Sequence, residues 1–327
     1  MDTRLIHLKD WLQTIIPNED FNLTSASADA SFRRYFRITT KQRVFICMDA
    51  PPEKEDCRPF VHFADLLQKQ GVYVPKIYAQ NIEQGFILLE DLGRVDFLTS
   101  LESAGEPDIL YQSAIDVLIK IQQGDPDLAP KYDKTKLIEE MSLFNDWFIE
   151  RHLGASLDTK SIDVWNLLQE RLCLACLEQP QVWVHRDFHS RNLMVAENNN
   201  TGVIDFQDLV TGPISYDLAS IFKDCYIKWP RQRQLSWLKQ YHHKSNNESF
   251  SFDQLTQWYD LTGFQRHLKV LGIFCRLKYR DGKESYLKDL PRVANYCLEV
   301  MEIYSNSITE INEFHDLFLP FFRKVAM

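Results

Sequence analysis

The chain has 327 residues, of which 45% are hydrophobic and 25% are charged, a mixture typical of globular proteins with a full core. Its 46 acidic residues outnumber 37 Lys and Arg, so the net charge is −9. Sequence-independent binding to nucleic acid or to an anionic membrane needs a basic surface, and we expect neither partner. No apolar run is long enough to span a membrane, and the N-terminus does not resemble a signal peptide. Seven scattered cysteines, an odd number, indicate reduced thiols and a cytoplasmic protein.

The N-terminal part of the chain predicts a small antiparallel sheet with helices around it. Apolar residues keep helical spacing from Leu5 to Ile16, and Pro17 ends this helix. YFRIT (35–39) and RVFICMD (43–49) alternate as strands do and are joined by a short turn. A helix over 53–71 follows, and two further strands come after it. They are YVPKIYAQN (73–81) and GFILLEDLG (85–93).

Helical spacing dominates from about residue 94. Three long amphipathic segments come first, and two short strands interrupt the series before helices resume to the C-terminus. These segments are DILYQSAIDVLIKIQQ (108–123), KLIEEMSLFNDWFIERHL (136–153) and SIDVWNLLQERLCLACLEQ (161–179). The sequence therefore predicts an α+β fold of two lobes. A small antiparallel β-sheet lobe spans 1–93 and ends in a hinge, and a larger, mainly helical lobe spans 94–327.

Cys173 and Cys176 form a C-x-x-C pair, which is compatible with a redox pair or half of a zinc site. They lie within a helical pattern, and no second ligand pair follows at the spacing of a zinc site. We therefore interpret both as core residues.

The motif HRDFHSRN (185–192) places His185, Asp187 and Asn192 in the pattern H-x-D-x-x-x-x-N. Two short apolar runs around a polar turn follow, and the second run ends at Asp205. A hairpin here would return Asp205 beside Asn192. Phosphoryl transfer uses such a set: one Asp takes the proton of the attacking hydroxyl, and oxygen ligands hold magnesium against the nucleotide phosphates. The alternative is that these acids only cap and brace loops.

Several stretches carry a resemblance to a known family. HRDFHSRNLMV (185–195) and VIDFQD (203–208) are similar to the aminoglycoside phosphotransferase-like small-molecule kinases, relatives of the protein kinases. ASFRRYFRI (30–38), GFILLEDLG (85–93) and RHLKVLGIFCRLKYRDGK (266–283) extend the resemblance toward the bacterial anomeric kinases of N-acetylmuramate and N-acetylglucosamine, the AmgK type. The resemblance implies a two-lobed protein-kinase-like fold, ATP and Mg as cofactors, a small-molecule sugar acceptor and a role in peptidoglycan recycling.

The resemblance also implies roles for individual residues. Asp187 is the catalytic base, and Asn192 and Asp205 are the metal ligands. His185 and Asp217 support the loop, with Asp217 tying down its backbone. The candidates for substrate binding can also be loop, cap or solvent-exposed residues, and they are His189, Arg191, Gln207, Asp208 and Asp224. For Arg191, the further alternatives are that it neutralises phosphate charge or pairs with an acid. For a carboxylate-bearing sugar, further cations are available in the C-terminal helices, although salt bridges explain them as well: Arg266, His267, Arg276 and Arg280.

The nucleotide side departs from the protein-kinase pattern. The loop around Ser31 and Phe32 has no glycine, and Met48 stands where a strand lysine is expected. Arg33 and Arg34 are the nearest cationic candidates for the phosphates, and strand alternation should point them to opposite faces. At the hinge, the backbone around Glu90 and Leu92 is expected to bind adenine.

Three alternatives remain open at this point. The acceptor can be an aminoglycoside, or it can be a small alcohol such as choline. A pseudokinase that binds a ligand without catalysis is the alternative from a different class. Met48 favours the pseudokinase, whereas the intact set of Asp187, Asn192 and Asp205 opposes it.

Overall fold

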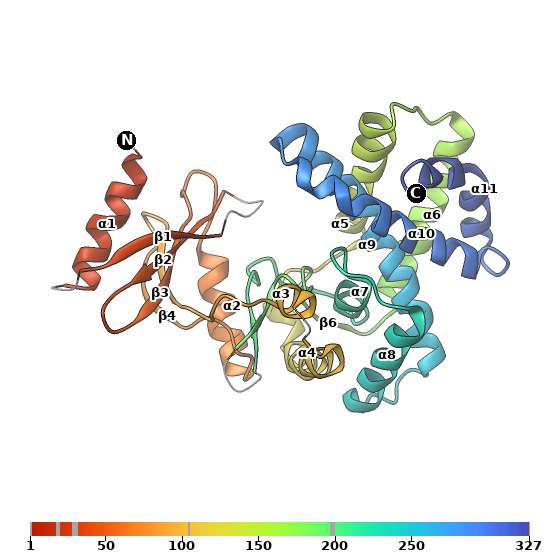
Figure 1. Cartoon of the computed structure of the whole chain (residues 1–327). Coiled ribbons are helices and arrows are strands. Elements are labelled where there is room, and N and C mark those ends of the chain that lie inside the picture. Colours follow the sequence, from red (N-terminus) through yellow and green to blue (C-terminus); the bar gives the residue numbers. More distant parts are fainter. Residues whose placement is uncertain (1, 18–19, 28–31, 104, 197–199, 327) are drawn as a thin grey trace. The chain divides into compact units, whose positions relative to one another are not determined.

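The computed structural model describes residues 2–17, 20–27, 32–103, 105–196 and 200–326. The chain forms two compact units (Figure 1). The smaller comprises Met1–Asp96 with Leu193–Asp208, and the larger comprises Phe97–Asn192 with Leu209–Met327.

A five-stranded antiparallel sheet forms the smaller unit, with the strand order β1-β2-β3-β5-β4. Its strands are β1 (Asn22–Ser27), β2 (Arg34–Thr39), β3 (Val44–Asp49), β4 (Ile77–Asn81) and β5 (Phe86–Glu90). The predicted strands correspond to β2 to β5. Strand β1 was not predicted, because its residues, NLTSAS, are mostly polar and lack the apolar alternation of a half-buried strand.

The two faces of this sheet carry different side chains. Helix α1 (Thr3–Ile15) packs its residues Leu8, Trp11 and Leu12 against one face. The sheet residues in this cluster are Ile38, Phe45, Cys47, Phe86 and Leu88, which alternate along their strands. Because neighbouring residues of a strand point to opposite faces, Met48 lies on the face away from α1.

The hairpin of β7 (Leu193–Val195) and β8 (Thr201–Val203) belongs to the smaller unit, although its residues follow the first helices of the larger unit. The Val195 N–H donates to the Val95 carbonyl at 2.8 Å, and the Val203 N–H donates to the Tyr73 carbonyl at 2.8 Å. The Phe206 ring lies 4.7 Å from that of Phe60 on α2 (Arg58–Lys69). These contacts group the hairpin with the sheet, whereas the sequence analysis assigned it to the helical lobe.

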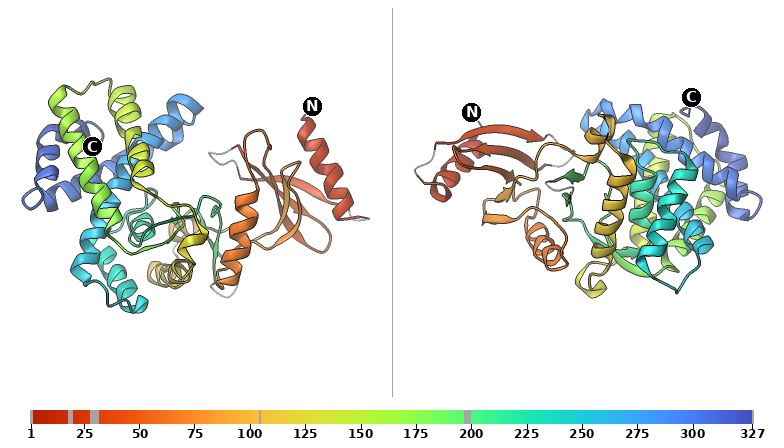
Figure 2. Two further views of the ribbon diagram at one scale, coloured as in Figure 1. Left: turned by 180° about the vertical axis from the view of Figure 1, so that it is seen from behind. Right: turned by 60° about the horizontal axis from the view of Figure 1, so that its bottom comes forward.

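The larger unit is mainly helical (Figure 2). Its helices up to the hairpin are α3 (Phe97–Glu102), α4 (Pro107–Gln122), η1 (Pro126–Leu128), α5 (Lys134–Leu143), the π-helix η2 (Phe144–His152) and α6 (Thr159–Leu177). The remaining helices are α7 (Tyr216–Phe222), α8 (Arg231–Ser245), α9 (Phe252–Asp281), the 3₁₀-helix η4 (Glu284–Asp289), α10 (Leu290–Tyr304) and α11 (Thr309–Arg323). One short ribbon joins β6 (Gln181–Val184) to β9 (Val210–Pro213). The three long helical segments that the sequence predicts correspond to α4, α5 with η2, and α6.

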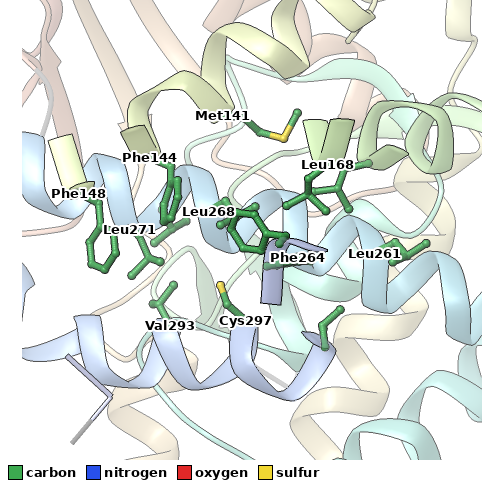
Figure 3. Packing of buried hydrophobic residues seen from close by; sticks show 14 of the residues in the cluster. Met141, Phe144, Phe148, Leu168, Leu261, Phe264, Leu268, Leu271, Val293 and Cys297 are labelled. Atoms are coloured by element: carbon green, nitrogen blue, oxygen red, sulfur yellow. The ribbon is translucent and has the colours of Figure 1, made fainter. Parts of the chain in front are cut away.

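Helix α9 is the centre of the core of this unit. In Figure 3, Phe264 and Leu268 of α9 lie between Met141 of α5 and Cys297 of α10. All of these side chains are fully buried. Such close packing on several sides makes α9 the rigid support of the helical unit.

The cysteines are buried free thiols, including Cys173 and Cys176 within α6, as their interpretation as core residues predicts. No helix in the part of the chain that the structure describes is both long and apolar enough to cross a membrane.

Candidate active site

The residues from His185 to Asn192 follow β6 and form a compact loop, called here the catalytic loop. The His189 N–H donates to the Asp187 carbonyl at 3.0 Å, and the Asn192 N–H donates to the His189 carbonyl at 3.0 Å. The side-chain amide nitrogen of Asn192 donates to the same Asp187 carbonyl at 2.9 Å. Asn192 therefore closes the loop, as an Asn five residues after an Asp can do across two tight turns.

Asp217 of α7 supports the start of this loop. Its buried carboxylate accepts the N–H of His185 at 2.7 Å and the N–H of Arg186 at 3.1 Å. Arg186 has a φ of 75°, an unusual conformation for a residue other than glycine. Burial raises the pKa of Asp217 to about 6, although the charge of His185 and these two hydrogen bonds oppose the rise. Both contacts are those expected of a residue that ties down the loop backbone, and His185 is itself buried beneath the loop.

Asp224 supports the far end of the loop. Its carboxylate is fully buried and accepts the N–H of Ser190 at 2.8 Å and the N–H of Tyr226 at 2.8 Å. Because this carboxylate is fully buried, a sugar cannot contact it. The geometry gives Asp224 a bracing role in place of the expected substrate contact.

Asp187 projects from the loop with its side chain 49% exposed. Arg266 of α9 approaches it from the buried side, at 3.8 Å between guanidinium nitrogen and carboxylate oxygen. Burial by the surrounding loop would raise the pKa of Asp187, but Lys269, His189, Arg266 and Arg186 lower it to about 2. Asp187 is therefore ionised at neutral pH and is accessible to a hydroxyl group.

A buried ion network lies below the loop. Glu140 of α5 pairs with Lys269 at 2.8 Å and also with Arg186, and it accepts a hydrogen bond from the Tyr132 hydroxyl. Burial opposes ionisation of Glu140, yet the two cations hold its pKa below the ordinary value. The sequence analysis did not single out Glu140 or Lys269. Both are charged residues at helical positions that are otherwise apolar, and such a pattern indicates a buried ion pair.

Two candidates for substrate binding in this loop, His189 and Arg191, contact the Tyr226 ring. The His189 ring meets the edge of the Tyr226 ring at 5.2 Å, and burial lowers the pKa of His189. The Arg191 guanidinium lies over the face of the same ring, 4.8 Å from its centre. Both side chains therefore share Tyr226 as a neighbour.

The smaller unit holds the second acidic part of the motif. The register pairs Leu193 with Val203, so the hairpin returns the chain to the residue that follows Asn192. Asp205 has a φ of 66° and accepts a hydrogen bond from the Gln207 amide at 2.9 Å. The same amide donates to Asp208 at 3.2 Å. Gln207 thus orients two acids, and only Asp208 is fully exposed.

Asn192 and Asp205 have the chemistry of magnesium ligands. The amide nitrogen of Asn192 is the donor to the loop, so its Oδ1 is the atom that can face a metal. Asp205 supplies a carboxylate held by Gln207. Hard oxygen donors of this kind suit Mg²⁺, which takes few protein ligands because water and phosphate oxygens complete its shell.

Arg33 and Arg34, the cationic candidates for the nucleotide phosphates, both lie against acids. Arg34 faces α1 and pairs with Asp49 at 2.5 Å, together with Asp2. Arg33 pairs with Glu55 at 2.8 Å. Because Arg34 shares the α1 face with buried Asp49, Arg33 is the better candidate for the nucleotide phosphates, and this role stays a prediction.

Two other residues of this loop were singled out from the sequence. Phe32 is 59% exposed, and the Lys54 ammonium lies 4.3 Å from the centre of its ring. Ser31 lies outside the described residues.

Strand β5, which leads into the predicted hinge, ends at Glu90, and both the backbone and the side chain of Glu90 are hydrogen-bonded. The Glu90 N–H donates to the Lys76 carbonyl at 2.8 Å, and its carboxylate accepts from the Tyr73 hydroxyl at 2.9 Å. Leu92 is buried and faces Gly202 of the hairpin, where an added Cβ would approach its side chain to 2.7 Å. The N–H of Glu90 is therefore occupied within the sheet, so the backbone of Leu92 is the better candidate for the predicted adenine contact.

Comparisons with known proteins show the family of the chain. A model of the phosphotransferase enzyme family matches residues 22–256. The N-acetylmuramate/N-acetylglucosamine kinase of Pseudomonas aeruginosa is 42% identical over 95% of this chain and 96% of its own length. The enzyme of the same name from Neisseria meningitidis is 41% identical over 92% of each chain.

A solved structure supports the fold. Plasmodium vivax ethanolamine kinase superimposes with a TM-score of 0.67 over 89% of this chain and 86% of its own, at 13% identity. The two-lobed kinase-like architecture predicted from the sequence is thereby confirmed. Since the family model covers most of the chain and close relatives cover nearly all of it, the chain belongs to the phosphotransferase enzyme family.

Proposed function

We propose that this chain is an ATP-dependent kinase that phosphorylates the anomeric hydroxyl of N-acetylmuramate and N-acetylglucosamine. The observation that carries the proposal is the 42% identity, over nearly the full length of both chains, to a kinase named for these two sugars. The setting that follows is peptidoglycan recycling in a bacterial cytoplasm. The ethanolamine kinase shares only the fold, at 13% identity, so it gives no support for a small-alcohol acceptor.

The geometry of the catalytic loop supports a role for Asp187 toward the sugar hydroxyl. Its carboxylate is half-exposed and ionised, and hydrogen bonds of Asn192, Asp217 and Asp224 fix the loop that carries it. A carboxylate with a pKa of about 2 is a weak base. It therefore first orients the hydroxyl as a hydrogen-bond acceptor, and it takes the proton when the oxygen becomes acidic as its bond to phosphorus forms.

Asn192 and Asp205 are the residues that would hold magnesium. When bound, the ion neutralises negative charge on the nucleotide phosphates. The hairpin register supports this assignment, because β8 returns the chain to the residue after Asn192 shortly before Asp205. Gln207 keeps the Asp205 carboxylate oriented.

The test is magnesium-dependent ATP turnover with N-acetylmuramate, N-acetylglucosamine, glucose, kanamycin and choline, with phosphorus NMR on the product. We expect a phosphate on the anomeric carbon of the N-acetyl sugars, and we expect Asp187→Asn to abolish it. Asp163→Asn, which changes an exposed acid of α6, is the matched control and should keep full activity. Turnover with kanamycin or choline alone would contradict the sugar assignment. ATP binding without turnover on any acceptor would instead support a pseudokinase.

A further inference from the structure

Arg191 occupies a fixed position in the catalytic loop, four residues after Asp187. Its chain neighbours on both sides are tied down: the Ser190 N–H to Asp224 and the Asn192 N–H to the His189 carbonyl. Four residues of fully extended chain span at most about 14 Å, and the turns of this loop shorten that distance. The Arg191 backbone is therefore held in the same short, tightly turned loop as the proposed base.

The Arg191 side chain stacks on the ring of Tyr226, and the carboxylate of Asp224 fixes the backbone of Tyr226. Asp224 accepts the N–H of Tyr226 as well as that of Ser190, each at 2.8 Å. Tyr226 and the loop thus share one buried anchor. The Arg191 guanidinium lies 4.8 Å from the centre of the Tyr226 ring, and stacking of this kind restrains a guanidinium while leaving its N–H donors available.

The charge of Arg191 is not matched by an acid. Three other arginines of the larger unit are paired with acids: Arg186 with Glu140, Arg266 with Asp187 and Arg292 with Asp289. Within the described ranges, Arg191 has no Asp or Glu oxygen within 4.0 Å of its guanidinium, and the residue is exposed. The phenols of Tyr226 and Tyr286 are its polar neighbours instead. An exposed, stacked cation that no acid matches, carried by the same loop as the proposed base, suits an anionic group on the acceptor.

The two sugars of the proposed function differ by one such group. N-Acetylmuramate is N-acetylglucosamine with a lactyl ether on the oxygen at C3, and this ether carries a carboxylate. C3 is separated from the anomeric carbon by a single ring atom, so the carboxylate lies near the reacting end of the sugar.

We propose that Arg191 binds the lactyl carboxylate of N-acetylmuramate and so determines that this sugar is accepted. The inference rests on the proposed function. Arginine suits this task because its planar fork donates two parallel hydrogen bonds to a carboxylate.

The test compares the two sugars in Arg191→Met, which keeps an unbranched side chain on Tyr226 but removes the charge. We expect KM for N-acetylmuramate to rise about 10- to 100-fold, the loss expected for a charge-assisted hydrogen bond. KM for N-acetylglucosamine and for ATP should change by less than about threefold, and Arg191→Lys should be intermediate. Arg323→Met removes an exposed arginine of α11 and should change none of these constants. For the wild type, the methyl ester of N-acetylmuramate should lose the same factor as the variant does with the free acid.

Each other outcome contradicts the inference in a different way. An equal rise in KM for both sugars, or a rise in KM for ATP, would place Arg191 at the phosphates. Unchanged KM for N-acetylmuramate in a folded Arg191→Met would exclude the contact. A wild type that phosphorylates N-acetylglucosamine but not N-acetylmuramate would overturn the inference and leave the kinase function standing. A wild type inactive on both sugars would overturn both.

Discussion

The guanidinium of Arg266 lies 3.8 Å from the carboxylate of Asp187, and the arginine side chain is 3% exposed whereas the aspartate is 49% exposed. The cation thus approaches from the core and leaves the outer side of the carboxylate open. Arg266 also donates to the Cys225 sulfur at 3.4 Å, which fixes the guanidinium below the loop. A buried cation in this position both orients Asp187 and keeps it ionised.

Replacing Arg266 should therefore affect turnover more than substrate binding. We expect Arg266→Met to lower kcat by about tenfold, since misorienting a catalytic group by a fraction of an ångström has effects of this order or larger. KM for ATP should change little, and Arg266→Lys should recover part of kcat. Steady-state kinetics measure the effect. Loss of a neighbouring cation would also raise the pKa of Asp187 from about 2. In a plot of kcat against pH, the fall in kcat on the acid side should therefore begin at a higher pH.

The matched control for this prediction is Arg280→Met on the same helix. Arg280 is exposed and pairs with its neighbour Asp281 at 2.8 Å, so its loss should leave kcat unchanged. A folded Arg266→Met with normal kcat and an unshifted fall in kcat on the acid side would show that Arg266 acts only in stability.

Asp217 should give the folded protein a distinctive pH dependence. Its pKa is about 6 in the folded state, above the ordinary value of 3.8, because the carboxylate is buried. A raised pKa means that the folded state binds more protons than the unfolded state between these values. The contribution of Asp217 to stability is therefore fully present below about pH 4 and is lost as the pH rises through about 6.

Urea unfolding at two pH values tests this expectation. The difference in unfolding free energy between wild type and Asp217→Asn should be smaller at pH 7 than at pH 4.5, by about 2 kcal/mol. Asp158→Asn should show the opposite sign, because hydrogen bonds from Ser161 at an exposed helix N-terminus lower the pKa of Asp158. A pH-independent difference for Asp217→Asn would contradict a raised pKa.

Arg33 and Arg34 should differ in function: we expect Arg34 to stabilise the fold and Arg33 to bind ATP. We expect Arg34→Ala to lower the unfolding free energy by about 1 kcal/mol, because buried Asp49 would keep only Arg4 as a partner. Its dissociation constant for ATP should stay within twofold of the wild type. Arg33→Ala should instead weaken ATP binding by about 5- to 20-fold, in line with one lost charge-assisted contact. Isothermal titration with ATP and magnesium provides the measurement.

Arg43→Ala is the control for general charge effects, since Arg43 is exposed in the turn between β2 and β3. If Arg33→Ala and Arg43→Ala bind ATP equally well, the phosphate contact assigned to Arg33 is wrong. The cation that replaces the strand lysine at Met48 would then have to come from elsewhere in the chain.

The parts of the site that the sequence predicted are those set by local geometry or by the family pattern. The sequence predicted Asn192 only as a metal ligand, which stays a prediction; the structure adds that its amide nitrogen donates to the Asp187 carbonyl and closes the loop. Strand alternation predicted that Arg33 and Arg34 point to opposite faces; Arg34 lies on the α1 face with Asp49, and Arg33 precedes the strand. The contacts expected of Asp217 came from the resemblance, and its two hydrogen bonds match them.

The parts that the sequence analysis missed depend on which helices pack together. Arg266 was a candidate cation for a sugar carboxylate, and Lys269 was not singled out. They reach Asp187 and Glu140 because α9 runs through the core beside α5, and no local pattern specifies that neighbour. Asp224 was one candidate for sugar binding because it lies near the motif in sequence, with a cap or solvent-exposed role as the alternative. Its burial follows from tertiary packing and could not be read from spacing alone.

The crossing of α9 and α5 gives a last prediction, on stability. A Cβ added at Gly272 would lie 2.3 Å from both the carbonyl carbon and the carbonyl oxygen of Leu143, and backbone cannot move aside as a flexible side chain can. Gly272→Ala should therefore lower the unfolding free energy by about 2–4 kcal/mol through overpacking. Gly263 lies on the same helix, but an added Cβ there would be 3.4 Å from the nearest atom, on Lys223. Gly263→Ala should instead be neutral or stabilising by up to about 1 kcal/mol, since alanine favours the helix. Urea unfolding of both variants measures the contrast, and equal stability would mean that the two helices can separate at Gly272 without cost.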